Sequence, residues 1–342
     1  MYKSSLLCAL LCVTFLLHAD AQDPARTAAA SLDHAQQLFV QGKLDQSLSE
    51  LNSLAAQKPE PDGVERLRGL IYYQQNKFTE ADAAFATALA AHPQDTEAMQ
   101  LRGVTLFRMG NAAEAIPLLE QAHASVPSAN IDPNYVLGVS YLQVRRYDDA
   151  RRAFAAQYGF DPDSAPAYLL AARMCFHQEL SRPAEDFAKK AMQLNASLPL
   201  GHLLLGEIAL ANGDTVNAIA EFEKEQQLNP LNGEVYERLG DAYIRSGQYE
   251  QAQHALNRAV LLEPNATAPY ILLGKVLLSQ QNPVMAGMYL ERARRMDPGN
   301  YITHSLLAQA YRAEGRKEDS AREFQTAERL QSSSSPQLEA PQ

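Results

Sequence analysis

The most constraining feature of this sequence is that it repeats itself every 34 residues. The segments "LGEIALANGDTVNA" (205–218), "LGDAYIRSGQYEQA" (239–252) and "LGKVLLSQQNPVMA" (273–286) occupy the same place in three successive periods. A fixed period of this length is typical of chains built from one supersecondary unit copied many times. The 342 residues therefore predict a single array of similar units rather than two or three unrelated domains.

The register of the repeat follows from taking Gly233 as a first residue and stepping by 34, with one extra residue near 128–130. Nine repeats then cover residues 28–334, and they start at Ala28, Asp62, Thr96, Ile131, Ala165, Pro199, Gly233, Thr267 and Tyr301. Position 8 is always Gly or Ala, and position 20 is always Ala or Ser. Position 24 is large and apolar in eight repeats, and position 32 is Pro in seven.

Each half of a repeat has the pattern of an amphipathic helix, because apolar residues recur at intervals of three and four. One such helix is "VYERLGDAYIRSG", which Gly247 ends, and the next is "EQAQHALNRAVLLEP", which Pro264 ends. Small residues at positions 8 and 20 allow the two helices to approach closely, and the large residue at position 24 fills the space beside that contact. Each hairpin has an apolar face that only a neighbouring hairpin can bury, so we predict an all-α solenoid.

The combined pattern resembles the tetratricopeptide repeat (TPR) family, over about nine-tenths of the chain. The resemblance rests on small residues at positions 8, 20 and 27, aromatic residues or Leu at 11 and 24, and Pro at 32; the residues at 11 include Tyr72, Tyr141, Tyr243 and Tyr311. It implies a right-handed α-solenoid of about nine stacked helical hairpins. The chain has no Trp, and Gln157 and Glu225 replace the small residue at position 27, which we interpret as local repacking.

The first 21 residues have the organisation of a secretory signal peptide. Lys3 precedes an apolar run from Leu6 to Leu17, and Ala19-Asp20-Ala21 matches a signal-peptidase site with cleavage after Ala21. We therefore expect a periplasmic or secreted protein, with a lipid anchor or an uncleaved anchor as alternatives. The apolar run is too short for a spanning helix, so membrane association is expected to be at most indirect. Residues 22–27 are predicted to be a short linker, and residues 335–342 a disordered tail.

Composition and motifs argue against several classes of function. The formal net charge of −10 does not fit a nucleic-acid binder, which carries a basic surface. The histidines are dispersed, and the sequence has no HExxH motif, no Cys/His ligand spacing, no P-loop and no GxSxG elbow. Because the repeats leave no room for a catalytic domain, we expect a protein that is not an enzyme and that needs no cofactor or metal. Cys175 is predicted to be a buried core residue.

In the TPR family the first helix of each repeat lines a concave groove, mainly through positions 2, 5, 6, 9, 12 and 13. On this resemblance, position 12 forms an apolar ladder that can accept an amphipathic helix or an extended apolar peptide. The alternative is that these side chains pack against neighbouring helices. The candidate residues are Tyr73, Phe107, Leu142, Phe176, Leu210 and Ile244.

The same resemblance places charged residues in the groove. The basic candidates are Arg66, Arg108 and Arg173, and the acidic candidates are Glu207, Glu234, Glu237 and Asp241. A groove that is basic toward one end and acidic toward the other would orient a partner of complementary charge. The alternative is solvated charge without a partner. The sequence lacks both the Asn column and the Lys/Asn/Arg set by which some family members bind peptide backbones or acidic chaperone tails.

These observations predict an exported scaffold that mediates protein–protein interaction and binds a protein or peptide. The family resemblance and the signal together imply a setting in bacterial envelope assembly or export. One alternative is a polysaccharide or ligand binder, for which Tyr73 and Tyr135 are the candidate aromatic platforms. A second alternative is a structural solenoid that associates with itself.

Overall fold

The structure is a computed structural model that describes residues 24–57, 59–125 and 133–334. Within these ranges the chain forms 18 α-helices and no strand, which confirms the all-α prediction. In the same part of the chain, no helix combines the length and the apolar character needed to cross a membrane. The predicted signal peptide (1–21), the tail (335–342) and the extra residue near 128–130 lie outside the described residues.

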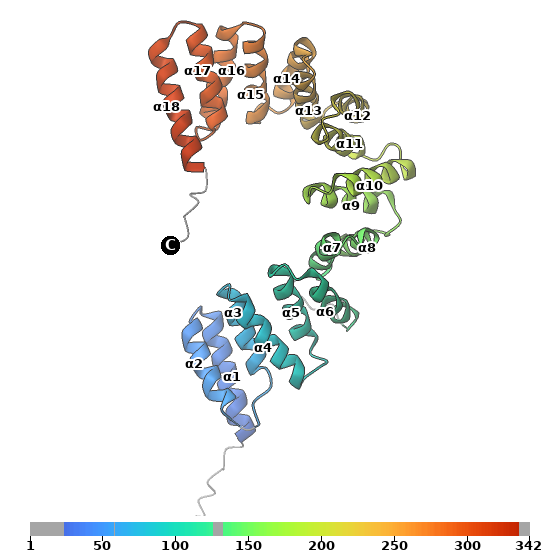
Figure 1. Ribbon diagram of the computed structural model, residues 1–342, viewed down its shortest axis with the longest axis vertical. Coiled ribbons are helices and arrows are strands. Elements are labelled where there is room, and N and C mark those ends of the chain that lie inside the picture. Colours follow the sequence, from blue (N-terminus) through green and yellow to red (C-terminus); the bar gives the residue numbers. More distant parts are fainter. Residues whose placement is uncertain (1–23, 58, 126–132, 335–342) are drawn as a thin grey trace, which may run out of the picture. The chain divides into compact units, whose positions relative to one another are not determined.

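The chain divides into two compact units, of which the first extends to Pro133. Its helices pair in chain order, α1 with α2, α3 with α4 and α5 with α6, and α4 also packs on α5 (Figure 1). The helices are α1 (Pro24–Val40), α2 (Leu44–Ala55), α3 (Val64–Gln74), α4 (Phe78–Ala91), α5 (Thr96–Arg108) and α6 (Ala112–Ser125). Helix α1 begins within the predicted linker, because a proline is well suited to the first turn of a helix.

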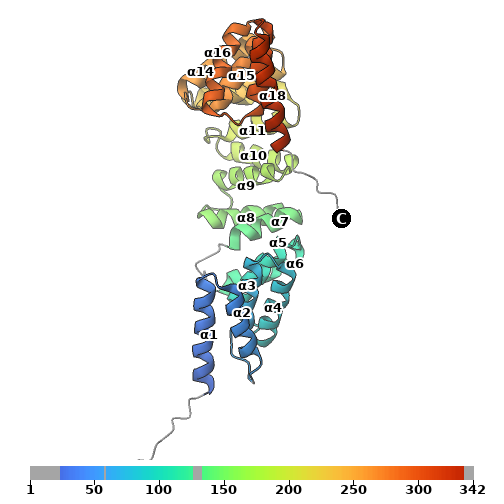
Figure 2. The same ribbon diagram turned by 90° about the vertical axis from the view of Figure 1, so that its left-hand side faces the viewer.

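The second unit starts at Asn134, in the first turn of α7, and continues through the last described helix. Its helices are α7 (Pro133–Gln143), α8 (Tyr147–Tyr158), α9 (Ala165–His177), α10 (Ser181–Leu194), α11 (Gly201–Ala211), α12 (Thr215–Leu228), α13 (Gly233–Arg245), α14 (Tyr249–Leu262), α15 (Thr267–Ser279), α16 (Pro283–Met296), α17 (Tyr301–Ala313) and α18 (Lys317–Ser334). From α9 onward, each helix packs on the next one in the chain. Helices α15 to α18 lie side by side in both ribbon views (Figures 1 and 2).

The predicted close packing of the two helices within a repeat is confirmed by the glycines at position 8. A Cβ atom on Gly206 would lie 2.4 Å from the ring of Phe222, and one on Gly240 would lie 2.5 Å from the Leu256 side chain. Both of these position-24 side chains are fully buried. Only glycine lets the helices approach this closely beside so large a neighbour.

Where position 8 is alanine, the rest of the packing changes with it. In the fifth repeat Ala172 faces a small residue, Ala188, at position 24, and both are fully buried. In the first and last repeats position 20 is serine, and Ser47 and Ser320 donate hydrogen bonds to the carbonyl oxygens of Ala35 and Ala308 at 2.7 and 2.8 Å. In the fifth repeat, therefore, a larger residue at position 8 is matched by a smaller one at position 24, whereas the serines of the first and last repeats add a hydrogen bond between the two helices.

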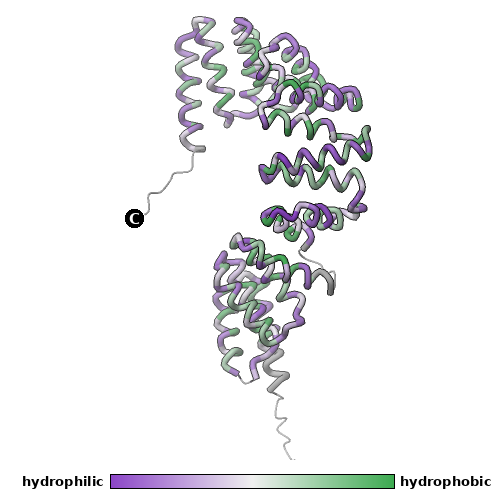
Figure 3. Tube along the Cα trace, turned by 45° about the vertical axis from the view of Figure 1, so that its right-hand side comes forward, coloured by the Kyte–Doolittle hydropathy of each residue, from purple (hydrophilic) through white to green (hydrophobic). Residues whose placement is uncertain are grey.

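Hydrophobic and hydrophilic residues alternate along the helices, as the coloured trace shows (Figure 3). This alternation gives each helix a buried stripe and an exposed one. Within unit 2, for example, a buried cluster joins Leu203 and Leu210 of α11, Phe222 of α12, and Val235 and Leu239 of α13. In this part of unit 2 the core thus runs from one hairpin into the next.

Candidate binding surface

Polar side chains at position 4 hold the first helix of a repeat to the turn before it. Tyr236 and Tyr270 donate hydrogen bonds to the carbonyl oxygens of Pro230 and Pro264, at 3.0 and 3.1 Å. Buried His304 makes the equivalent contact, with 2.9 Å from its Nε2 to the carbonyl oxygen of the preceding repeat's proline. Each contact joins the carbonyl of a proline turn to the helix that follows it.

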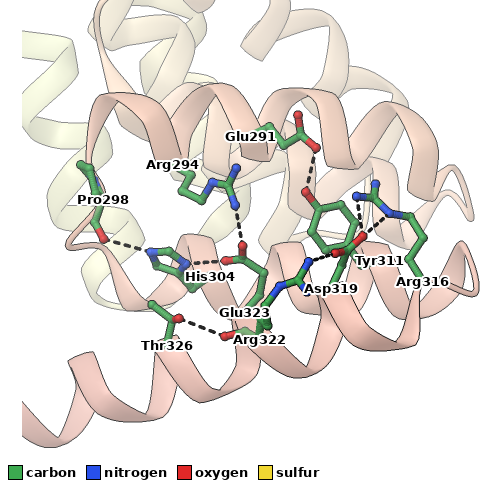
Figure 4. Close-up of polar contacts among 10 residues, drawn as sticks. All are labelled: Glu291, Arg294, Pro298, His304, Tyr311, Arg316, Asp319, Arg322, Glu323 and Thr326. Atoms are coloured by element: carbon green, nitrogen blue, oxygen red, sulfur yellow. Dashed lines mark hydrogen bonds and ion pairs between the residues drawn. The ribbon is translucent and has the colours of Figure 1, made fainter.

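In the last repeat, several such polar contacts join neighbouring helices (Figure 4). Nδ1 of His304 contacts the carboxylate of Glu323, which also pairs with Arg294 of α16. The hydroxyl of Tyr311 donates to Glu291 of α16 at 2.7 Å. Burial, together with this hydrogen bond, raises the pKa of Tyr311 to about 12. The histidine is therefore part of a structural network, and the described residues contain no cluster of metal-ligating side chains.

The apolar ladder predicted at position 12 is largely internal. Leu142, Leu210 and Ile244 are buried, and Tyr73, Phe107 and Phe176 are half-buried. Tyr73 packs edge-on against Phe78, with ring centroids 5.5 Å apart. Tyr73 and Phe107 belong to unit 1, and the other four belong to unit 2. Half of the predicted ladder is therefore buried in the core, and the other half is only partly exposed to a partner.

Two of the three predicted basic residues lie in unit 1, and there they already have partners. Arg66 pairs with Asp95 at 2.7 Å and with Glu97 at 3.4 Å. The guanidinium of Arg108 lies over the ring of Phe78, 5.0 Å from its centroid. Arg66 is thus neutralised by carboxylates at the start of α5, and Arg108 is held by an aromatic face.

The four predicted acidic residues come together in unit 2, on two successive first helices. Glu207 lies on α11, and Glu234, Glu237 and Asp241 follow one another along α13. We call these four residues the acidic surface. Helices α11 and α13 pack against each other directly as well as through α12. The spacings of three and four residues along α13 place its three carboxylates on one side of the helix.

Arg238 forms ion pairs with two residues of the acidic surface. Its guanidinium lies 3.2 Å from the carboxylate of Glu207 and 3.5 Å from that of Glu234. Glu207 is 12% exposed, and its burial raises its pKa, although Arg238 and Arg173 of α9 act in the opposite direction. Arg238 was not among the residues predicted for the groove. Its spacing of four residues from Glu234 was the signal that could have identified its role.

Glu237 differs from its neighbours because no ion pair joins it to any cation in the described residues. It is half-buried, and this burial is the main cause of its raised pKa. Arg238 lowers the pKa, but Glu234, Glu263 and Asp241 raise it further. Asp241 itself pairs with Arg245 at 2.9 Å. Negative charge is therefore concentrated at a partly desolvated carboxylate, where an added cation would be stabilised.

Glu225 is a second residue whose role the sequence did not indicate. It occupies position 27, where the pattern favours a small residue, and it is fully buried. Its carboxylate accepts hydrogen bonds from the backbone N–H groups of Leu200 and Leu203, at 2.9 and 3.2 Å, and from the side chain of Asn229. It thus caps the start of α11 and supports the helix that carries Glu207.

The fold defines a helical-repeat protein, and two of its first helices, α11 and α13, carry the acidic surface. Profiles described as "Tetratricopeptide repeat" match residues 66–130 and 286–335, and residues 106–175 and 209–276. The chain belongs to the tetratricopeptide repeat family.

Known relatives are distant in sequence. The BBSome complex member BBS4 of Bos taurus is 24% identical over 296 residues, which cover 86% of this chain and 56% of that protein. A TPR repeat-containing protein of Treponema pallidum is 24% identical over 91% of this chain and 42% of its own. The chain spans about half the length of the curated relatives it matches. The crystal structure of YrrB, described as a TPR protein with an unusual peptide-binding site, is 20% identical with a TM-score of 0.46; the match covers 55% of this chain and 95% of that one.

Proposed function

We propose that this protein is a non-enzymatic scaffold that binds a positively charged protein segment on the acidic surface of unit 2. The observation that carries the proposal is the environment of Glu237, a half-buried carboxylate with a raised pKa and three like charges around it. A lysine or arginine of a partner would relieve this repulsion and gain a partly desolvated ion pair. Such pairs contribute more to binding and specificity than fully exposed ones do.

We propose that the protein is exported through its N-terminal signal, is cleaved after Ala21, and acts in the periplasm or outside the cell. The basis is the sequence of residues 1–21, which has the three regions of a secretory signal. A role in assembly or export at a bacterial envelope fits both this location and a scaffold. Two relatives are named as subunits of large complexes, the BBSome and the anaphase-promoting complex. A rigid surface of this kind lowers the entropic cost of binding.

The test uses the chain from residue 22 onward as bait in native envelope extract, followed by purification of the captured partner and calorimetric titration. We expect Glu237→Gln, which keeps the side chain's shape and removes its charge, to weaken binding by about tenfold or more. The matched control is Glu250→Gln, which removes one exposed carboxylate of α14 in the same repeat. Equal binding by the wild type and Glu237→Gln would refute the proposed site.

The pH dependence gives an independent readout. A bound cation favours the ionised carboxylate, so binding lowers the pKa of Glu237 and releases protons. We therefore expect affinity to rise as the pH increases through the raised pKa of Glu237, and this rise to be smaller in Glu237→Gln. An identical pH profile in both proteins would place the partner elsewhere.

A further inference from the structure

Helix α16 has an exposed face unlike that of any other second helix in unit 2. Val284, Met285 and Met288 expose 61%, 38% and 60% of their surface. At the position of Met288, the other repeats of the unit carry charged, small or histidine residues: Arg152, Asp186, Ala220, His254 and Arg322. The fold does not need apolar residues here, because the buried side of α16 is formed by Ala286, Leu290 and Ala293.

Toward the C-terminal end of α16, the same face carries positive charge. Arg292 and Arg295 are exposed, and no carboxylate of the described residues forms an ion pair with either of them. Arg294 lies between them in sequence but points to another partner, the Glu323 carboxylate of α18. With about 100° per residue, Val284, Met285, Met288 and the two free arginines fall within an arc of about 100°. We call these five residues the α16 face.

The order of residues along the helix defines what can bind there. At about 1.5 Å rise per residue, the apolar half and the basic half together extend over about 17 Å. Methionine side chains are flexible and polarisable, and they adapt to apolar surfaces of different shapes. We infer that the α16 face binds an amphipathic segment of a partner protein, with apolar residues against Val284, Met285 and Met288 and carboxylates against Arg292 and Arg295.

Two other occupants fit this surface less well. An anionic membrane is usually recognised by four or more clustered basic residues beside bulky aromatic or leucine side chains, whereas this face has two arginines and no aromatic ring. A second copy of the chain, joined through the same face, would bring four unpaired arginines into one interface. The charge of the face therefore favours an acidic protein segment, and this binding is separate from the cation recognition proposed for Glu237.

The experiment measures fluorescence anisotropy of labelled helical peptides with the full chain. One peptide has a leucine stripe followed by glutamates on the same face, a second has lysines in place of the glutamates, and a third is a scramble of the first. We expect the acidic peptide to bind at least tenfold more tightly than the other two. Val284→Gln combined with Met288→Gln should weaken it at least tenfold. Val216→Gln is the matched control, because Val216 is a 76% exposed valine at the position of Val284 on α12.

Charge reversal gives the decisive comparison. Arg292→Glu combined with Arg295→Glu should reverse the preference, so that the lysine peptide binds more tightly than the glutamate peptide. No preference among the three peptides would overturn the inference, and so would binding that is lost in Glu237→Lys but not in the α16 variants. Flotation with vesicles containing phosphatidylglycerol, or self-association, that depended on Val284 and Met288 would also overturn it, in favour of a membrane or of a second copy.

Discussion

The substitution Gly206→Ala tests the packing rule of the repeats that have glycine at position 8. A Cβ atom at Gly206 would lie 2.4, 2.5 and 2.9 Å from three ring atoms of Phe222, whose side chain is fully buried. Inserting a methyl group into a filled core costs about 1–3 kcal/mol, since the ring cannot move into solvent. Alanine is better than glycine within a helix by about 1 kcal/mol, which offsets part of this cost. We expect the net free energy of unfolding to fall by up to about 2 kcal/mol.

A double-mutant cycle with Phe222→Ala measures the interaction between positions 8 and 24 of this repeat. This second change copies the fifth repeat, in which Ala172 and Ala188 occupy the same two positions. With the ring absent, Gly206→Ala should stabilise the protein by about 1 kcal/mol through helix propensity alone. The interaction energy between the two sites is then about 1–3 kcal/mol, within the range of directly contacting residues.

The assay is urea unfolding followed by circular dichroism, supported by hydrogen exchange of the amides in α11 and α12, because repeat arrays can unfold in stages. Gly287→Ala is the control glycine. Its Cβ would meet only the end of the flexible Glu314 side chain, at 3.1 Å, so this substitution should be neutral or stabilising. If Gly206→Ala stabilised the protein equally in the presence and absence of the Phe222 ring, the packing argument would be refuted.

Two further predictions concern the polar contacts between helices. Glu225→Ala removes the carboxylate that caps α11, so we expect a loss of about 1–2 kcal/mol and faster exchange of the Leu200 and Leu203 amides; unchanged exchange would contradict the capping role. Tyr311 has its pKa raised from 10.0 to about 12, so its neutral form is favoured in the folded chain, and the stability it contributes is present below pH 10 and lost as the pH rises toward 12. Tyr311→Phe should reduce this alkaline loss in unfolding experiments, and an equal loss in both proteins would argue against it.

Much of the fold was predictable because the same packing contact between two helices recurs in many repeats. The glycine at position 8 and the large residue at position 24 are visible as columns, and the contact of Gly206 with Phe222 is the physical reason for both columns. The burial of Cys175 was also predictable, and that burial raises its thiol pKa to about 12. A column of similar residues indicates the packing that the repeats share. It does not indicate a contact that is made in a single repeat.

The candidate surface was less predictable for that reason. Leu142, Leu210 and Ile244 occupy a column typical of the family groove, but their burial depends on the neighbouring helices that pack over them. The acidic residues were found from the register, whereas the ion pair of Arg238 with Glu207 depends on the distance between α11 and α13. An ion pair between two repeats requires its side chains to lie close in space, and the alignment of the repeats in sequence does not give that distance.

The contacts between repeats also bear on how the acidic surface can bind. The hydroxyl of Tyr243, on the helix that carries Glu237, donates to Glu223 of α12 at 2.8 Å. Helix α11, which carries Glu207, is capped by Glu225 of the same α12. One second helix therefore fixes both first helices that form the surface, so the spacing of the carboxylates is set before a partner arrives. Because that ordering is completed during folding, the cation of the proposed partner would meet carboxylates that are already in place, and little of the binding free energy would be spent on ordering them.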